Sequence, residues 1–210
     1  MTGTGPGSNT LRTVVAAALL AVLCACASSG MRAERQTWDP VSVPRNKVLV
    51  VGKIEMHPPL SEDEQLLKGG RGGELRNAFV LFCGDQQRDL SARLPEDLSG
   101  GFDITLEKEF FITVDRDKPL AISGGIFYTA YDPPANVQYR TFSSPLMAML
   151  KPGDEAVYIG TIQFYRDANN RLLSVTIRDD HQWADTRYKE RFGTYSSLRK
   201  ALAMPAPPSQ

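Results

Sequence analysis

The sequence is poor in the residues and charge patterns that mark several common functions. It has only two histidines, His57 and His181, and neither lies at metal-ligand spacing from another histidine or a cysteine. Basic and acidic residues number 24 each, so the net charge is zero and no bulk attraction to nucleic acid is predicted. An early apolar run, Val14 to Ala25, has about 12 residues, whereas a membrane-spanning helix needs ~20. We therefore expect no histidine-based metal site, no binding of nucleic acid, and no membrane-spanning helix at this run.

The same apolar run has the length of a signal-peptide core and ends in Leu23-Cys24-Ala25-Cys26. This ending resembles the lipobox of bacterial lipoproteins, in which leucine stands three places before the cysteine and a small residue directly before it. Cys26 satisfies both positions, whereas Cys24 has the bulky Leu23 directly before it. The resemblance implies a diacylglyceryl group on the thiol of Cys26, cleavage before that residue, and a further acyl chain on the freed amine. Several chains make a lasting anchor, where one chain binds only marginally.

Two other interpretations of the N-terminus are open. Ala25-Cys26-Ala27 also fits the small-x-small rule for an ordinary secretory signal, with cleavage before Ser28. The apolar run could also serve as a plain N-terminal membrane anchor. Under the lipoprotein interpretation, Ala27 in place of aspartate implies transfer to the outer membrane by the rule for enteric lipoproteins. We therefore expect a lipid-anchored protein on the periplasmic face of the outer membrane.

Removal of residues 1–25 and lipidation of Cys26 would leave Cys83 as the one remaining thiol, so no internal disulfide is expected. Cys83 ends an apolar run, Phe79 to Cys83, that is typical of a strand. Because burial in apolar surroundings raises the pKa of a thiol, we expect an inert cysteine rather than a nucleophile. The mature chain would carry 23 basic and 24 acidic residues, which again predicts no nucleic-acid partner.

Composition divides the chain into four parts. These are a lipoprotein signal peptide (1–25), a tether (26–46), a β-sandwich domain with a C-terminal helix (47–193), and a short helix with a disordered tail (194–210). The tether contains serine, glycine and proline among scattered charges and is not expected to pack. Alternation of apolar and polar residues predicts the strands of the domain. Their ranges are 47–56, 74–84, 102–107, 109–115, 120–131, 137–142, 145–150, 156–165 and 172–178.

Two stretches show the alternation most clearly. In strand 47–56, Lys53 and Glu55 lie on the face opposite the apolar one. Strands 156–165 and 172–178 are expected to form a hairpin, because the residues between them have the chemistry of a turn. Three residues of the second arm are expected to share one face: Leu173, Val175 and Ile177. Gly124-Gly125 predicts a bulge or bend within strand 120–131.

After residue 178 the pattern changes from strand to helix. Asp179 or Asp180 is suited to capping a helix over 181–192, which Gly193 ends. A second short helix is expected at about 196–203. Many short strands followed by one or two helices predict a mainly β fold, in the form of an antiparallel sandwich with a C-terminal helical appendage.

Pro152-Gly153-Asp154, followed by Val157-Tyr158-Ile159-Gly160-Thr161-Ile162, an acidic pair and a helix, resembles a group of bacterial envelope lipoproteins. Those proteins have an immunoglobulin- or transthyretin-like sandwich and mostly no known activity. The resemblance covers about residues 105–192. It implies an immunoglobulin/transthyretin-like fold for the domain, and it supplies no catalytic residues.

The other candidates for chemistry have plainer structural explanations. The glycines between Gly69 and Gly73 lack the Lys-Ser/Thr ending of a P-loop and are expected to form a bend between strands. Glu62-Asp63-Glu64 could bind a cation with Asp85, but it is more simply a solvated acidic face. Ser123 lacks the glycine spacing of a serine hydrolase. Paired carboxylates for glycan cleavage are left open, because that geometry is long-range. No cofactor is expected.

Aromatic residues are the remaining signal, and eight of them cluster in the predicted strands: Phe127, Tyr128, Tyr131, Tyr139, Phe142, Tyr158, Phe164 and Tyr165. Core packing is expected for most, while an outward-facing subset would suit an interface. We therefore expect a lipid-anchored, non-catalytic binding or scaffolding module with an envelope protein as partner. The alternatives are a structural subunit of an envelope machine, such as a secretion apparatus, and a cell-wall or glycan-acting hydrolase.

Overall fold

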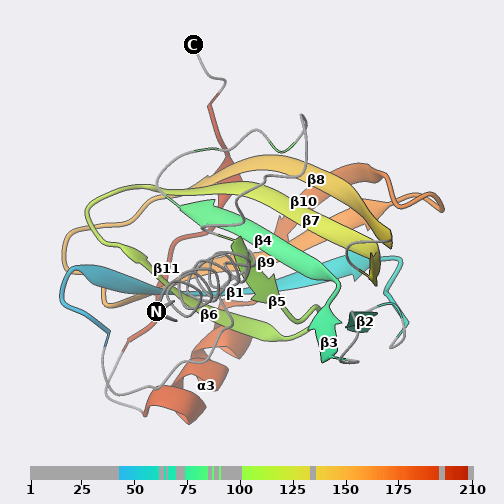
Figure 1. The fold of residues 1–210 in the computed structure, drawn as a ribbon. Helices are drawn as coiled ribbons and strands as arrows, with labels where there is room; N and C mark the ends of the chain where they lie inside the picture. Colours follow the sequence, from blue (N-terminus) through green and yellow to red (C-terminus); the bar gives the residue numbers. More distant parts are fainter. Residues whose placement is uncertain are drawn as a thin grey trace, which may run out of the picture. The chain divides into compact units, whose positions relative to one another are not determined.

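The computed structural model describes residues 43–61, 64, 66–69, 74–84, 87, 90, 101–132, 136–193 and 197–207, and this part of the chain is mainly β (Figure 1). The strands are β1 (Lys47–His57), β2 (Leu66–Gly69), β3 (Glu74–Asn77), β4 (Phe79–Gly84), β5 (Gly101–Ile104), β6 (Glu109–Asp115), β7 (Leu120–Asp132), β8 (Asn136–Ala148), β9 (Ala156–Arg166), β10 (Leu172–Arg178), β11 (Arg199–Lys200) and β12 (Met204–Pro205). The helix is α3 (His181–Phe192). Among the described residues, no helix is both long and apolar enough to span a bilayer. The predicted signal peptide and most of the tether lie outside these residues.

The strands form two five-stranded sheets and one two-stranded sheet. The first, here called the β9 sheet, has the order β10-β9-β1-β6, with β11 also beside β9. The second, the β7 sheet, has the order β12-β8-β7-β4-β5. Strands β2 and β3 pair with each other, with Gly69 opposite Glu74. The glycines predicted to form a bend lie, apart from Gly69, outside the described residues, and β2 itself was expected to be a loop.

Strands β1 and β9 run parallel, which corrects the prediction of a purely antiparallel sandwich. Leu49 is opposite Ala156, and Met56 is opposite Phe164. Both strands contain long stretches without an exposed residue, because the β7 sheet covers one face of the β9 sheet and α3 covers part of the other. Continuous burial is typical of parallel strands. Alternation within one strand identifies its faces but carries no information about the direction of its neighbour.

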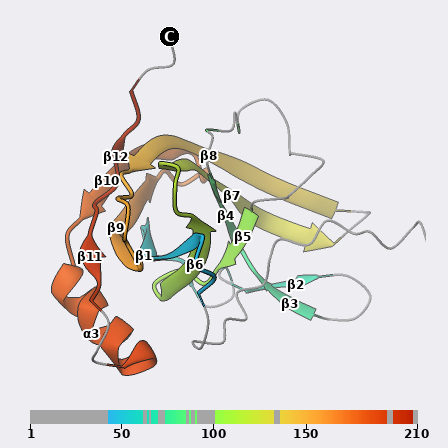
Figure 2. The same cartoon turned by 90° about the vertical axis from the view of Figure 1, so that its left-hand side faces the viewer.

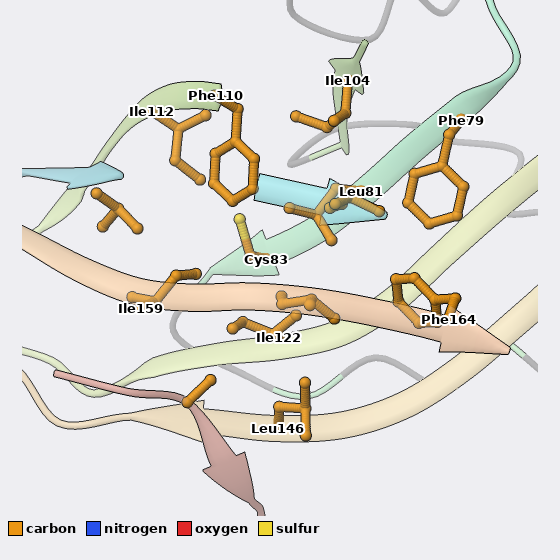
Figure 3. Packing of buried hydrophobic residues seen from close by; sticks show 14 of the residues in the cluster. Phe79, Leu81, Cys83, Ile104, Phe110, Ile112, Ile122, Leu146, Ile159 and Phe164 are labelled. Atoms are coloured by element: carbon orange, nitrogen blue, oxygen red, sulfur yellow. The ribbon is translucent and has the colours of Figure 1, made fainter. Parts of the chain in front are cut away.

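The two large sheets pack face to face across one hydrophobic core (Figure 3). Phe110 and Ile159 enter it from the β9 sheet, and Phe79 and Ile122 enter it from the β7 sheet, all four almost fully buried. The rings of Phe79 and Phe164 lie 5.5 Å apart, centroid to centroid, and so connect the layers directly. The mainly β, two-layer architecture predicted from the alternation is confirmed.

The outer face of the β9 sheet is partly covered by α3, which lies beside β9 and β11 (Figure 2). Ala184 and Tyr188 of the helix pack on Val51 and Tyr158 of the sheet. The predicted bounds of the helix are confirmed, and the backbone N–H of Gly193 closes it on the carbonyl of Lys189 at 2.9 Å. The backbone places Asp180 at the N-cap, but its carboxylate makes no capping bond there. Its side chain bonds to the sheet instead.

A bulge in β9 determines which of its side chains face outward. Val51 pairs with Tyr158 and Lys53 pairs with Thr161, so β9 contains one residue more than β1 between these positions. Gly160 lies in this bulge with a φ of 108°, a conformation that glycine adopts without the steric cost of a Cβ. Because the bulge shifts the alternation by one residue, both Tyr158 and Thr161 face away from the core between the two sheets, and Tyr158 is buried in the cluster that includes residues of α3.

Bulges also explain two differences from the predicted strands. The predicted strands 137–142 and 145–150 are parts of one strand, β8, because Pro145 lies in a bulge opposite β7, where its missing N–H interrupts no ladder bond. In β10 the register shifts between Leu172 and Ser174, so Leu172 packs on the core and Leu173 is 66% exposed. The prediction that Leu173 shares a face with Val175 and Ile177, which pack on the core, is therefore wrong. The bulge predicted at Gly124 is confirmed by the register shift there.

The C-terminal residues 198–206, here called the strap, connect the two sheets instead of forming the predicted second helix. Its β11 pairs in parallel with β9, and its β12 pairs antiparallel with β8 (Figure 2). The backbone N–H groups of Ala201 and Ala203 donate to the carbonyls of Tyr158 and Ile159, each at 2.8 Å. Backbone hydrogen bonding to the edges of β8 and β9 thus outweighs the local helix propensity of this segment.

The Pro152-Gly153-Asp154 turn is joined to the strap by a partly buried ion pair. Arg199 donates from Nε to Oδ1 of Asp154 at 2.6 Å, and the backbone N–H of Lys151 donates to Oδ2 at 2.6 Å. Burial raises the pKa of Asp154, but the bonds from Arg199 and Lys151 outweigh burial and hold the pKa below its usual value. This turn motif, which carries part of the resemblance, therefore has a structural role here.

The variant Asp154→Asn is expected to lower the free energy of unfolding by about 2–3 kcal/mol, because it removes one charge from an ion pair whose acid is only 8% exposed. Urea denaturation followed by circular dichroism measures the loss. Asp117→Asn, at an exposed turn acid, is the matched control and should change stability by less than about 0.5 kcal/mol. Equal losses in the two variants would contradict a role for the ion pair.

Candidate functional site

A polar cluster lies on the outer face of the β9 sheet, beside the N-terminus of α3. It is here called the Glu55 cluster, and its members are Lys53, Glu55, Thr161, Gln163, Thr176, Arg178 and Asp180. Strand register brings them together, since Glu55 is opposite Gln163 and Gln163 is opposite Thr176. The sequence places Lys53 and Glu55 on this face by simple alternation, as predicted.

Glu55 is the centre of the cluster and is only 5% exposed. Its Oε1 accepts hydrogen bonds from Lys53 Nζ at 2.7 Å and Arg178 Nη2 at 2.8 Å, and its Oε2 accepts one from Gln163 Nε2 at 2.9 Å. Burial alone would raise the pKa of Glu55, but the bonds from Lys53, Gln163 and Arg178 outweigh burial and lower the pKa to about 2. The carboxylate is therefore ionised at neutral pH and held in one orientation.

Arg178 connects this centre to the start of α3. Its Nε donates to Oδ2 of Asp180 at 2.7 Å, and Thr161 Oγ1 donates to the same oxygen at 2.8 Å. The backbone N–H of Asp180 donates to the hydroxyl of Tyr158 at 3.1 Å, and burial raises the pKa of that tyrosine. Asp180 does not cap the helix with its side chain, because its carboxylate accepts hydrogen bonds from Arg178 and Thr161 of the sheet.

Aromatic side chains lie at both ends of the cluster. The ammonium group of Lys53 lies 5.3 Å from the ring centroid of Trp183 on α3, a cation–π contact. At the other end, His57 stacks on Tyr165 with 4.8 Å between ring centroids. His57 Nε2 accepts a bond from Gln163 Nε2 at 3.3 Å. Tyr165 and Trp183 are both partly exposed, so they are outward-facing aromatics of the kind expected at an interface.

The chemistry of the cluster is that of a fixed polar surface. Its two cations, Lys53 and Arg178, balance its two carboxylates, Glu55 and Asp180. Arg178 is 46% exposed and offers donors to solvent or to a partner. Beside the cluster, an open hollow of about 530 Å³ is lined by Asp179, Asp180, His181, Gln182, Trp183 and Lys200. Such an arrangement can bind and orient a polar partner, whereas a low-pKa carboxylate is a poor proton donor.

Cys26, the predicted lipidation site, lies outside the described residues. Cys83 is buried in the core between the sheets, as predicted, and burial raises its pKa to about 12 (Figure 3). The predicted burial of Cys83 is confirmed, and a thiol with a raised pKa is expected to be protonated at neutral pH and unreactive.

The other residues considered for chemistry in the sequence are explained by their contacts or burial in the fold. His181 Nε2 donates to the carbonyl of Leu198 at 2.8 Å and so holds the strap, while Ser123 is buried within β7. Glu64 accepts a bond from the backbone N–H of Ser61 at 2.9 Å, whereas its neighbours Glu62 and Asp63 and the more distant Asp85 lie outside the described residues. No group of three or more potential metal-ligating side chains was found within the described part of the chain.

The eight aromatic residues named from the sequence include a buried group and a partly exposed group. Five of the eight residues are at most 2% exposed and pack in the interior: Phe127, Tyr128, Phe142, Tyr158 and Phe164. Tyr139 and Tyr165 are partly exposed, and the side chain of Tyr131 is not among those described. Core packing of most of the set is confirmed.

Sequence reasoning did not identify the Glu55 cluster. The only available signal was a glutamate and a lysine two residues apart on one face of a strand, which is ordinary for a solvated surface. Its partners Gln163 and Arg178 come from strands more than 100 residues further along the chain. No protein-family model, curated protein or solved structure matches this chain.

Proposed function

We propose that this protein is a lipid-anchored component of the bacterial envelope, attached to the outer membrane through Cys26 and facing the periplasm. Its β domain would act there as a non-catalytic binding or scaffolding module. The observation that carries the proposal is the sequence Leu23-Cys24-Ala25-Cys26 at the end of a short apolar run. Strand β1 begins at Lys47, so about 20 residues separate the anchor from the first strand. The lipid provides attachment, and the intervening chain provides reach.

We also propose that the two sheets belong to the immunoglobulin/transthyretin-like class of sandwich. Support comes from the two-layer packing and from the turn motif at Pro152-Gly153-Asp154, which directly precedes the central strand β9. The parallel pairing of β1 with β9 is the feature in which this domain departs from a purely antiparallel arrangement.

The lowered pKa of Glu55 favours a binding role for this surface over a catalytic one. A glycan hydrolase needs a carboxylic acid whose pKa is raised, so that it carries a proton at neutral pH. The pKa of Glu55 is instead lowered to about 2, and both of its oxygens accept hydrogen bonds from neighbouring side chains. The polar surface formed by the Glu55 cluster, with Tyr165 and Trp183 at its ends, is the binding face we assign to the module.

A second candidate function is that of a structural subunit in a larger envelope assembly. Strand β10 ends the order of the β9 sheet within the described part of the chain. It carries the exposed Leu173, and Ser174 and Thr176 are also exposed along it. An edge strand of this kind can be extended by a strand from another protein.

Metabolic labelling with radioactive palmitate tests the anchor directly. We expect the full-length protein to incorporate label and to fractionate with membranes. Cys26→Ala should lose both properties completely, whereas the matched variant Cys24→Ala, changed within the segment that is cleaved away, should retain both. Unlabelled wild-type protein in the soluble fraction, with Ser28 as its first residue, would establish an ordinary secretory signal and overturn the proposal.

A further inference from the structure

The hollow beside the Glu55 cluster is formed by three chain segments: the turn after β10, the first turn of α3, and β11 of the strap. Figure 2 shows α3 and β11 side by side. Two contacts hold the segments together, because Lys200 Nζ donates to Oδ2 of Asp179 and His181 Nε2 donates to the carbonyl of Leu198, each at 2.8 Å. The volume of about 530 Å³ falls within the roughly 300–1,000 Å³ of small-molecule sites. The hollow therefore has walls held by side-chain contacts and room for a ligand.

Trp183 gives the hollow an aromatic wall. Its side chain is partly exposed, and the ammonium group of Lys53 lies 5.3 Å from the centroid of its ring. Packing of Trp183 on the buried cluster under α3 further restricts the ring. The face of an aromatic ring carries partial negative charge and attracts groups with partial positive charge, such as C–H groups next to oxygen atoms. This wall therefore suits a ligand that has one face of C–H groups.

The charges around the hollow are paired within the protein. Asp179 pairs with Lys200 at 2.8 Å, and Asp180 pairs with Arg178 at 2.7 Å. The hydrogen bonds from Lys200 and from the backbone N–H of His181 hold the pKa of Asp179 below its usual value, so this carboxylate is ionised and accepts hydrogen bonds. Paired charges give no net attraction for a charged ligand, and two carboxylates at the start of α3 repel an anion. The balance favours a neutral, polar ligand.

Three exposed side chains of the hollow can bond to hydroxyl groups: Asp179, Gln182 and Lys200. A carboxylate accepts at several lone pairs, an ammonium group has several donors, and an amide offers both donors and an acceptor. The contact between Asp179 and Lys200 uses only part of this capacity. Because that contact already fixes the two side chains, a ligand that binds them costs less side-chain entropy. Donors and acceptors beside an aromatic wall match a ring that carries hydroxyl groups at its rim.

We propose that the hollow binds a neutral saccharide, with the C–H face of a pyranose ring on Trp183 and its hydroxyl groups bonded to Asp179, Gln182 and Lys200. A pyranose combines an apolar face with a polar rim, which are the two features that these walls recognise. The inference rests on the proposed binding face and names its ligand, but it does not depend on the lipid at Cys26. We expect a dissociation constant of roughly 1 mM for a short oligosaccharide, because much of its surface stays in solvent in an open hollow.

The test uses the full-length protein in a detergent without a sugar headgroup, with the change Trp38→Phe so that Trp183 is the remaining tryptophan. The probes are three neutral tetrasaccharides: chitotetraose, cellotetraose and maltotetraose. At least one of them should shift the fluorescence emission of Trp183 in a saturable way, and the sugar should remain uncleaved. Inorganic phosphate and spermidine, as a free anion and a free cation, should neither cause the shift nor displace the sugar.

Variants are compared by ligand-observed NMR, which does not depend on tryptophan fluorescence. Trp183→Ala should weaken binding at least about tenfold. Trp183→Phe keeps an aromatic wall and its packing, so it should weaken binding by less. Gln182→Ala should weaken binding several-fold, whereas the matched control Gln138→Ala, at an exposed glutamine on β8, should leave it unchanged. Circular dichroism establishes that each variant is folded.

Two results would overturn the saccharide site: no binding of any of the three tetrasaccharides, or binding that the changes at Trp183 and Gln182 leave unaltered. Displacement of the sugar by phosphate would also overturn it, in favour of an anionic ligand. None of these results would affect the proposed lipid anchor, because palmitate labelling of Cys26 tests the anchor independently. Cleavage of a bound tetrasaccharide would support the saccharide site but contradict the proposed non-catalytic function.

Discussion

Replacing Gly124 with alanine is expected to cost about 4 kcal/mol or more and to leave little folded protein. An added Cβ would lie 1.9 Å from the carbonyl oxygen of Phe142 and 2.8 Å from the backbone nitrogen of Ser144. Both atoms belong to the backbone of β8 and cannot move without separating β7 from β8. The φ of 112° at Gly124 adds conformational strain for any residue with a Cβ. The amount of soluble protein and its urea midpoint measure the effect.

Gly153→Ala separates the two causes of this loss. Gly153 also has a positive φ, 88°, but an added Cβ there would meet no atom within 4 Å. The control should therefore lose only the strain contribution, about 1–2 kcal/mol. If Gly124→Ala lost no more than Gly153→Ala, the close approach of β7 and β8 would not be the deciding constraint.

The variant Glu55→Gln is expected to lower the free energy of unfolding by about 2–3 kcal/mol at pH 7. The change keeps the size and one acceptor of the side chain, but it removes the charge that holds Lys53 and Arg178. The difference between the ordinary pKa of Glu55, 4.5, and its folded value of about 2 corresponds to ~3 kcal/mol. The expected loss does not exceed this value, because Arg178 keeps its hydrogen bond to Asp180 in the variant. Thermal and urea denaturation of both proteins give the difference.

The same difference should depend on pH in a defined direction. The folded pKa of Glu55 lies below its unfolded value, so its ionised form contributes fully above about pH 4.5 and progressively less as the pH falls towards 2. The stability difference between the wild type and Glu55→Gln should shrink across that interval. Other carboxylates contribute equally to both proteins, and subtraction removes them.

Glu190→Gln is the matched control for Glu55. Glu190 forms an ion pair with Arg187 on α3, but its side chain is 57% exposed, and pairs of that kind contribute little. It should change stability by less than about 0.5 kcal/mol at every pH. A Glu55→Gln loss that stayed constant down to pH 2 would show that shape, and not charge, makes Glu55 important.

Elements that depend on neighbouring residues could be predicted from the sequence. The β9–β10 hairpin follows from the turn chemistry of Asp167, whose carboxylate accepts bonds from the backbone N–H groups of Asn169 and Arg171. The helix over 181–192 and its end at Gly193 follow from local signals of the same kind. The core side of β1 follows from alternation, because a strand with one apolar face must bury that face.

Elements that depend on distant partners could not be predicted. The strap residues have the composition of a short helix, and only the available edges of β8 and β9 make them extended. Leu173 does not share the face of Val175 and Ile177 because a bulge shifts the strand by one residue, and no local signal marks that shift. Glu55 is expected on a polar face, but its burial and its low pKa come from Gln163 and Arg178 on other strands. Cys26 remains a prediction, because it lies outside the described residues.

The position of β1 inside its sheet affects the order in which the domain is completed. This first strand lies between β6 and β9, which end at residues 115 and 166. A ribosome making the chain from its N-terminus therefore releases Val48 and Val50 long before both flanking strands exist. Contacts between residues so far apart in sequence form slowly and leave apolar segments open to aggregation in the meantime. The apolar side chains of β1 therefore lack their native neighbours until nearly the whole domain has been synthesised.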